Sequence, residues 1–150
     1  MHFLSKRTVL GIAAVADVAL YARPAPVAAK ALAARHNLPP RHLETLLQGL
    51  VQANILKGVR GPRGGYELAR ERRKITVGEI VRTVAGMSAA DSDEGGGSSR
   101  LVKKVIEPSV RKAGESFLAN LDAITVEDLC AAAIAARILE DEQAGGDFAI

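Results

Sequence analysis

The clearest hydrophobic pattern in the chain lies between residues 43 and 50. Apolar side chains recur there at intervals of three and four residues, which places them on one face of a helix. Pro39 and Pro40 come just before, and proline suits the first turn of a helix because its missing N–H would have no partner there. The pattern therefore predicts an amphipathic helix that starts near residue 40. Its apolar stripe consists of Leu43, Leu46, Leu47 and Leu50.

A shorter helix is predicted before this one. Pro26 suits its first turn and Asn37 suits its end. Two helices joined by a short break are typical of a helix-turn-helix, in which the early positions of the second helix enter the DNA major groove. From these two helices alone, an ordinary helical hairpin with a solvated face is the simpler interpretation. The apolar residues of the shorter helix are Val27, Ala31, Leu32 and Ala34.

The segment that follows, "NILKGVRGPRGGYELA", predicts a β-hairpin. Two short runs with β-branched or aromatic residues flank a glycine-rich turn, and Arg60 and Arg63 place positive charge at its tip. Glycines allow positive φ angles and close backbone approach, and their N–H groups can meet phosphate oxygens. A nucleotide-binding loop is disfavoured, because the turn lacks G-x-x-x-x-G-K-[ST] and leads into a strand. Two helices and a hairpin make a winged helix.

The N-terminal apolar run, residues 9–22, has the basic start and small residues of a secretory signal peptide. Asp17 lies inside the run, however, where a carboxylate opposes membrane insertion, and the run is too short to span a bilayer. We therefore expect a core helix in a cytoplasmic protein with no membrane partner. Its apolar side is predicted to carry Val9, Ala13, Ala16 and Leu20.

Charge is distributed unevenly along the chain. Residues 1–75 contain 13 Lys and Arg against 4 Asp and Glu, whereas residues 76–150 contain 7 against 13. A basic first half is typical of a protein that meets a polyanion, and the acidic second half suggests another task. The alternative is an uneven but simply solvated surface.

The second half predicts further helices. Thr76 with Glu79, and Thr125 with Asp128, have capping-box spacing, so helices are expected to start near residues 77 and 126. Pro108 implies a kink or a late start in the helix between them. That helix carries an apolar stripe suited either to a partner helix or to packing within the monomer. The stripe consists of Val110, Ala113, Phe117 and Leu121.

Four segments together resemble the winged-helix repressors of the IscR, NsrR and BadM type, also called the Rrf2 family. They are "LSKRTVLGIAAVADVAL", "ALAARHNLPPRHLETLLQGLVQANILKGVRGPRGGYELAR", "ITVGEIVRTVAG" and "LDAITVEDL". The resemblance implies a mainly α fold with a small β-hairpin wing, a winged helix-turn-helix followed by a long dimerisation helix. It also implies a homodimer that binds near-palindromic double-stranded DNA. The four stripe residues named above would then serve dimerisation.

The resemblance also implies which residues contact DNA and how the chain divides. Glu44 repels phosphate, so its expected role is to accept from a cytosine amino group or to orient an arginine. We expect a DNA-binding domain over 1–86, a flexible acidic Gly/Ser loop over 87–99, dimerisation and sensing helices over 100–142, and a tail over 143–150. The expected DNA contacts are Ser5 and Lys6 to phosphates, Arg41, His42, Glu44 and Thr45 to bases, and Arg60, Arg63 and Gly64 on the wing.

One departure from the family concerns its iron–sulfur cluster. Many members hold a cluster on three cysteines in the loop before the dimerisation helix, because such clusters favour thiolate ligands. This chain has one cysteine, Cys130, and its three histidines are scattered, so no metal or cofactor is expected. Cys130 is either a small buried apolar residue or a redox site. A small-molecule effector or a partner protein would otherwise supply the signal.

We conclude that the sequence predicts a homodimeric DNA-binding repressor. A winged-helix protein-interaction module without an operator is the alternative. An enzyme is not expected, because the sequence shows no paired carboxylates, no nucleophile with a base and no metal-ligand set.

Overall fold

The computed structural model describes residues 3–88 and 99–138. The predicted mainly α fold with a small two-stranded antiparallel sheet is confirmed. Most of the expected loop 87–99 and the whole tail 143–150 lie outside the described residues. The elements are α1 (Lys6–Tyr21), α2 (Ala29–Arg35), α3 (Pro40–Gln52), β1 (Leu56–Val59), β2 (Gly65–Leu68), a 3₁₀ turn (Arg72–Lys74), α4 (Val77–Ser88), a π-helical segment (Val102–Ile106), α5 (Glu107–Asp122) and α6 (Val126–Ala135).

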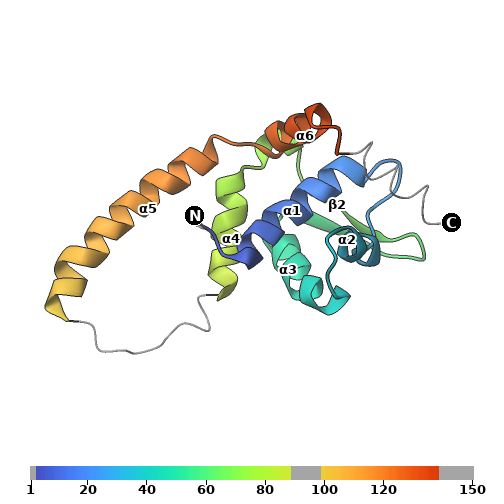
Figure 1. Cartoon of the computed structure of the whole chain (residues 1–150). Helices are drawn as coiled ribbons and strands as arrows, with labels where there is room; N and C mark the ends of the chain where they lie inside the picture. Colours follow the sequence, from blue (N-terminus) through green and yellow to red (C-terminus); the bar gives the residue numbers. More distant parts are fainter. Residues whose placement is uncertain (1–2, 89–98, 139–150) are drawn as a thin grey trace.

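The core forms around α1, which contacts α3, α4 and α6 (Figure 1). The leucine stripe of α3 is fully buried, as its spacing predicts. Val126 and Cys130 of α6 belong to the same core, although they lie in the segment 100–142 expected to form dimerisation and sensing helices. The last described helix therefore packs against the half of the chain that holds the helix-turn-helix and the hairpin.

The predicted apolar side of α1 is wrong. Val9 is 52% exposed, and the other three residues of the predicted stripe are only partly buried. The buried face instead carries Gly11, Ala14, Val15 and Val18. A Cβ atom on Gly11 would lie 2.7 Å from Val84, so the missing side chain lets α4 pack closely. Since nearly every position of α1 is apolar or small, hydrophobic spacing could not identify this face.

The first helix of the helix-turn-helix is shorter than predicted. It begins at Ala29, because Val27 forms a β-bridge with Tyr66 of the wing. Leu32 and Ala33 are buried, whereas Ala31 and Ala34 of the predicted set are exposed.

The wing is a regular hairpin in which β1 and β2 pair from Leu56 with Leu68 to Val59 with Gly65. Two glycines are required here by close backbone contacts. A Cβ atom on Gly64 would lie 2.2 Å from the carbonyl oxygen of Val59, and one on Gly65 would lie 2.3 Å from that of Val27. The predicted close approach of backbones is confirmed.

Both predicted capping sequences start helices. Thr76 Oγ1 accepts from the N–H of Glu79 at 3.1 Å, but the Glu79 carboxylate binds Arg70 instead of completing the box. Thr125 and Asp128 form both hydrogen bonds of a capping box, and these hydrogen bonds lower the pKa of Asp128 below its usual range. Of the two effects expected from Pro108, the late start is wrong: helical backbone already begins at residue 100 and continues through the π-helical segment into α5, in which Pro108 is the second residue.

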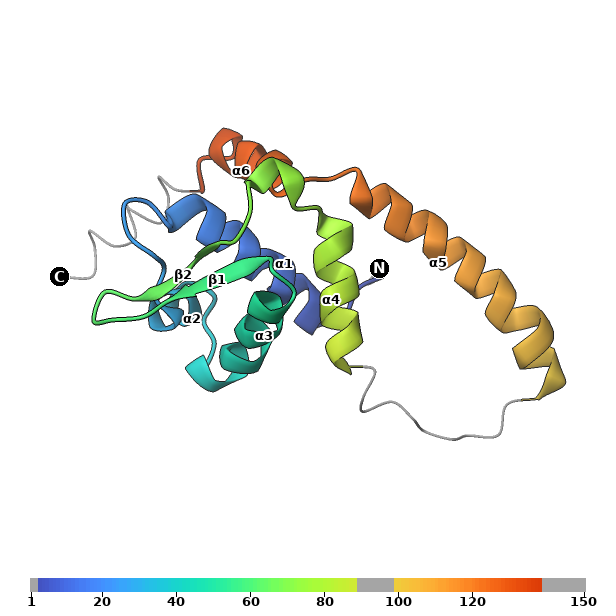
Figure 2. The ribbon, with the colours of Figure 1, turned by 180° about the vertical axis from the view of Figure 1, so that it is seen from behind.

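The long helix α5 extends away from the rest of the molecule in both views (Figures 1 and 2). Its inner end is held by Arg82, which donates two hydrogen bonds, of 2.6 and 2.8 Å, to the carboxylate of Asp122. These hydrogen bonds keep the pKa of Asp122 below its usual range. Within the described residues, no helix combines the length and hydropathy needed to cross a bilayer.

Candidate nucleic-acid interface

The exposed face of α3 carries the residues expected to contact bases. Its four leucines are buried against the core, which leaves the intervening polar side chains exposed. No side chain caps the N-terminus of α3, whose N-cap residue is Pro39. The first turn therefore keeps a partial positive charge that favours phosphate. The exposed polar residues are Arg41, His42, Glu44 and Thr45.

The N-terminal turn of α1 lies beside this face. A cleft of about 710 Å³ between the two helices is lined by Lys6 and Arg7 of α1 and by Arg41, His42 and Thr45 of α3, among others. The structure thus brings Lys6 to the same cleft as Arg41, His42 and Thr45, whereas Glu44 does not line it. Ser5 has a structural task as well, because its hydroxyl caps α1 by accepting from the N–H of Thr8 at 3.1 Å.

The wing presents two arginines. Arg60 and Arg63 are exposed at the turn between β1 and β2. The wing tip and the N-terminal end of α3 extend toward the same side of the molecule (Figures 1 and 2). Gly64 is packed against the backbone of the turn, and its N–H donates to the carbonyl of Gly61 at 2.9 Å. Its contribution is therefore to shape the tip.

Within the described residues, several cations of this surface have no carboxylate partner, as is also true of exposed cations elsewhere such as Lys104 and Lys112; what this surface adds is that such cations lie around α3 and at the wing tip. Within residues 3–88 and 99–138, Arg35, Arg70 and Arg82 are each paired with a carboxylate from another element. Five cations near α3 and on the wing tip have no carboxylate partner among these described residues. They are Lys6, Arg7, Arg41, Arg60 and Arg63. Cations left without internal partners favour an external anion.

An ion pair fixes the turn of the helix-turn-helix to α1. Asp17 has a buried side chain that accepts two hydrogen bonds from Arg35, and His36 Nε2 lies 3.0 Å from its Oδ2 atom. Arg35 also lies over the ring of Tyr21, 4.0 Å from its centroid. Because Arg35 and His36 directly precede the turn into α3, these contacts hold the start of that turn against α1.

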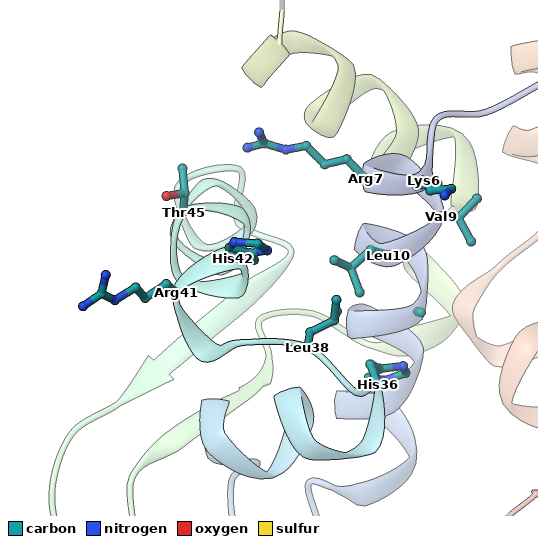
Figure 3. A pocket seen from close by; sticks show the side chains of 10 residues that line it. Lys6, Arg7, Val9, Leu10, His36, Leu38, Arg41, His42 and Thr45 are labelled. Carbon is teal, nitrogen blue, oxygen red and sulfur yellow. The ribbon is translucent and has the colours of Figure 1, made fainter.

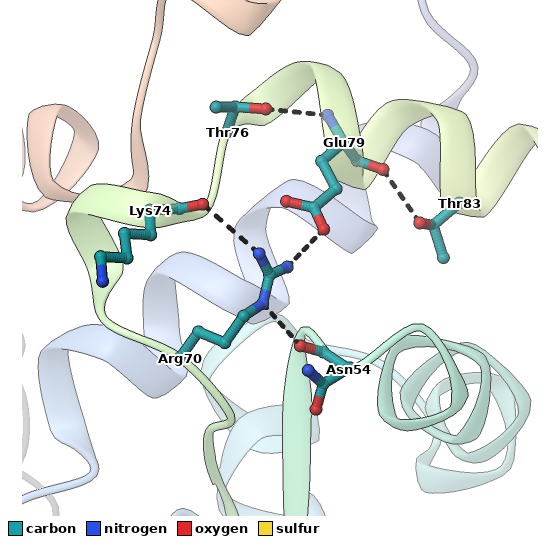
Figure 4. Close-up of polar contacts among 6 residues, drawn as sticks. All are labelled: Asn54, Arg70, Lys74, Thr76, Glu79 and Thr83. Carbon is teal, nitrogen blue, oxygen red and sulfur yellow. Dashed lines mark hydrogen bonds and ion pairs between the residues drawn. The ribbon is translucent and has the colours of Figure 1, made fainter.

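A second network fixes the base of the wing (Figure 4). Arg70, just after β2, donates to the carbonyl of Asn54 at 3.0 Å and to that of Lys74 at 3.5 Å. Its remaining nitrogen pairs with the carboxylate of Glu79 in α4, and Thr83 donates to the carbonyl of Glu79 at 2.9 Å. One guanidinium thus connects the end of α3, the wing and α4.

Sequence reasoning missed Arg7, Asp17 and Arg70. Arg7 follows Lys6 directly, so the basic start of the chain was the available signal. Asp17 is a charged residue within an apolar run, but nothing in the spacing pairs it with a residue 18 positions away. The partners of Arg70 likewise come from three separate elements.

The predicted dimerisation stripe divides into two parts. Val110 is 65% exposed and Ala113 is exposed, whereas Phe117 and Leu121 are half-buried. The Phe117 ring packs against that of Phe3, with centroids 5.8 Å apart. The apolar surface of the outer part continues into the preceding turns. Its other members are Leu101, Val105 and Ile106.

Cys130 is 1% exposed and lies in the core. Burial raises the pKa of its thiol above the ordinary value, an effect only partly offset by Arg72. The thiol is therefore protonated at neutral pH, and protonated buried thiols react slowly. The structure gives Cys130 a packing role and leaves its redox role a prediction.

Comparison with known proteins identifies the family. The Rrf2 family, described as "Iron-dependent Transcriptional regulator", matches residues 4–132. The chain belongs to the Rrf2 family. CymR, an HTH-type transcriptional regulator of Bacillus subtilis, is 33% identical over 105 residues, 69% of this chain and 72% of CymR. An HTH-type regulator of Rhodopseudomonas palustris named BadM is 27% identical over 127 residues, 84% of this chain and 80% of BadM.

Solved structures of Rrf2-family regulators share the fold. The structure of B. subtilis CymR superposes with a TM-score of 0.64 and 29% identity, covering 87% of this chain and 98% of CymR. IscR of T. potens superposes with a TM-score of 0.66 and 33% identity, covering 88% of each chain. This Rrf2-family chain is therefore a transcriptional regulator with a winged-helix fold.

The residues of this Rrf2 chain do not fit the iron that the family description names. A thiolate-held cluster needs several cysteines, and the whole sequence contains one, which is buried in the core. Within the described parts of the chain, no three His, Cys, Asp or Glu side chains gather at a common point. Asp91, Asp93 and Glu94 lie outside the described residues and are hard oxygen ligands, poorly suited to a cluster.

Proposed function

We propose that this Rrf2-family protein is a homodimeric repressor that binds a near-palindromic operator in double-stranded DNA. The first turns of α3 enter the major groove, and the wing lies against the adjacent minor groove. Lys6 and Ser5, at the start of α1, contact phosphates beside α3. The observation that carries the proposal is the set of five cations without carboxylate partners around α3 and on the wing.

Individual roles follow from position. Arg41, His42, Glu44 and Thr45 are exposed at the start of α3, where a recognition helix meets base edges. Glu44 accepts from a cytosine amino group or orients Arg41. Arg60 and Arg63 neutralise phosphates or enter the minor groove. Gly64 keeps the wing tip narrow enough to approach the DNA backbone.

Dimerisation is proposed from the outer part of α5. The outer part of α5 extends away from the core (Figure 2) and its apolar side chains are exposed, so a second copy that covers them would remove them from water. Two recognition helices related by two-fold symmetry require two half-sites, which explains the near-palindromic operator. A protein that acts on the chromosome works in the cytoplasm. Without a cluster, a small molecule, a partner protein or oxidation of Cys130 supplies the signal.

Selection from a random pool of duplex DNA tests the proposal. The full chain should enrich one motif with two inverted half-sites, at a stoichiometry of two chains per duplex. Thr45→Ala should change the preferred base at one position in each half-site, whereas Arg63→Ala should weaken binding to all duplexes or reduce an A·T preference. Gln52→Ala, at the far end of the exposed face of α3, is the control. No enriched motif would favour the protein-interaction alternative.

A further inference from the structure

The cleft between α1 and α3 has an apolar floor that phosphate binding does not require. Ten residues line its volume of about 710 Å³, which lies within the range of small-molecule sites. Four of them are apolar and come from α1 and from the turn before α3. They are Val9, Leu10, Ala13 and Leu38.

Leu10 and Leu38 form the part of this floor that faces α3, whereas Val9 points away from α3 on the opposite side of α1 (Figure 3). Leu10 points from α1 toward α3, and Leu38 lies below it on the turn between α2 and α3 (Figure 3). Both are only partly buried, although each packs against the core on its inner side. An apolar group in the cleft would therefore cover surface that now faces water.

The rim of the cleft is cationic. Arg7 extends from α1 in the direction of α3 (Figure 3), and its one polar contact within the described residues is the sulfur of Met87, at 4.0 Å. Lys6 and His42 have no carboxylate partner there either. No carboxylate lines the cleft, because Asp17 is turned to Arg35 and His36. The charges of the rim thus complement an anion.

We propose that this cleft binds a small organic anion, a carboxylate with an apolar body the size of a medium alkyl chain or one aromatic ring. The apolar body covers Leu10, Ala13 and Leu38, and the carboxylate lies between Arg7 and His42. A phosphodiester alone does not account for the floor, because it has no apolar side to place there. The ligand class follows from the combination of floor and rim.

Binding of this anion competes with DNA. Arg41, His42 and Thr45 line the cleft and also belong to the exposed start of α3, so one surface cannot serve both partners at once. This consequence rests on the proposed function, whereas the presence of the site does not. The anion then acts as an inducer that releases the operator directly.

Calorimetric titration of the full chain with octanoate tests the site without DNA. One octanoate should bind per chain, with inorganic phosphate and the uncharged octanamide each at least about tenfold weaker, a difference of about 1.4 kcal/mol. Ala13→Phe fills the floor and should abolish binding, whereas Ala119→Phe, on an exposed position of α5, should not. Arg7→Gln alters only an exposed side chain and should weaken octanoate binding without affecting the fold.

Three results would overturn the site: no saturable octanoate binding, phosphate binding as tight as octanoate, or unchanged binding in both Ala13→Phe and Arg7→Gln. A competition assay with the selected duplex then tests the inducer role. Octanoate should displace the duplex, and a ternary complex would refute competition. If the chain binds no duplex at all, the proposed function fails, while the octanoate titration still decides the site.

Discussion

Arg35 binds Asp17 through two parallel hydrogen bonds, Nε to Oδ2 at 2.8 Å and Nη2 to Oδ1 at 2.6 Å. The aspartate side chain is 4% exposed, so Arg35 and the neighbouring His36 replace water as its hydrogen-bond partners. This two-point pairing is the geometry that guanidinium and carboxylate favour. It joins the middle of α1 to the end of α2 and so determines how α3 is presented.

Asp17→Asn should lower the free energy of unfolding by about 1–3 kcal/mol, because it leaves Arg35 without its charged partner in a partly buried site. It should also weaken DNA binding, since the turn into α3 loses its anchor. Urea denaturation and anisotropy titration measure the two effects. Glu67→Gln breaks the exposed pair with Lys57 and should change stability by less than about 0.5 kcal/mol. Equal effects of the two substitutions would contradict the anchoring role.

The wing allows a test with two glycines of the same hairpin. Gly65→Ala should destabilise the protein by about 1–3 kcal/mol, because its Cβ atom would lie 2.3 Å from the carbonyl oxygen of Val27, which cannot move without breaking the bridge to Tyr66. Gly58→Ala, with no atom within 4 Å of its Cβ, should be tolerated. Thermal unfolding of both variants gives the comparison, and equal melting temperatures would refute the contact.

Some of this architecture follows from local patterns and some does not. The leucines of α3 recur every three or four residues with polar residues between them, so their spacing identified the buried face correctly. In α1 nearly every residue is apolar or small, and the buried face was set by the close approach of α4 to Gly11, a tertiary contact that spacing cannot reveal. Thr125 and Asp128 predicted where α6 begins, but not that Cys130 would belong to the same core as the buried residues of α1.

The candidate interface shows the same division. Exposed polar residues on α3 and arginines on the wing could be named from the sequence, because each lies within a local motif. The cleft could not, since Leu10 and Leu38 face each other only after α1 packs beside the helix-turn-helix. Its residues come from segments about 30 positions apart.

Dimerisation through α5 predicts a specific defect. Val110→Glu should convert the dimer to a monomer, because it places a charge in the apolar surface that the partner covers. Ala119→Glu introduces the same charge on the opposite side of α5, where the residue is also exposed, and should leave the dimer intact. Sedimentation equilibrium distinguishes the two. A monomeric parent protein, or two variants that dimerise equally, would exclude this interface.

The side chains available as iron ligands predict a protein without an iron–sulfur cluster. Protein purified under anaerobic conditions should be colourless, contain no stoichiometric iron or sulfide, and bind its selected duplex without iron, because one buried cysteine cannot replace three thiolates. Iron and sulfide analysis with a visible absorption spectrum provides the check. A charge-transfer band that persists in Cys130→Ser would require ligands of another kind.

Salt dependence of DNA binding tests the central claim most directly. Affinity for the selected duplex should fall steeply with added salt, since each phosphate neutralised contributes about −0.9 to the slope of log K against log salt concentration. Lys6→Ala should make that slope shallower by about 1 per chain, whereas Lys112→Ala, an exposed lysine of α5, should leave it unchanged. Binding that does not depend on salt, or no binding to any duplex, would contradict the account.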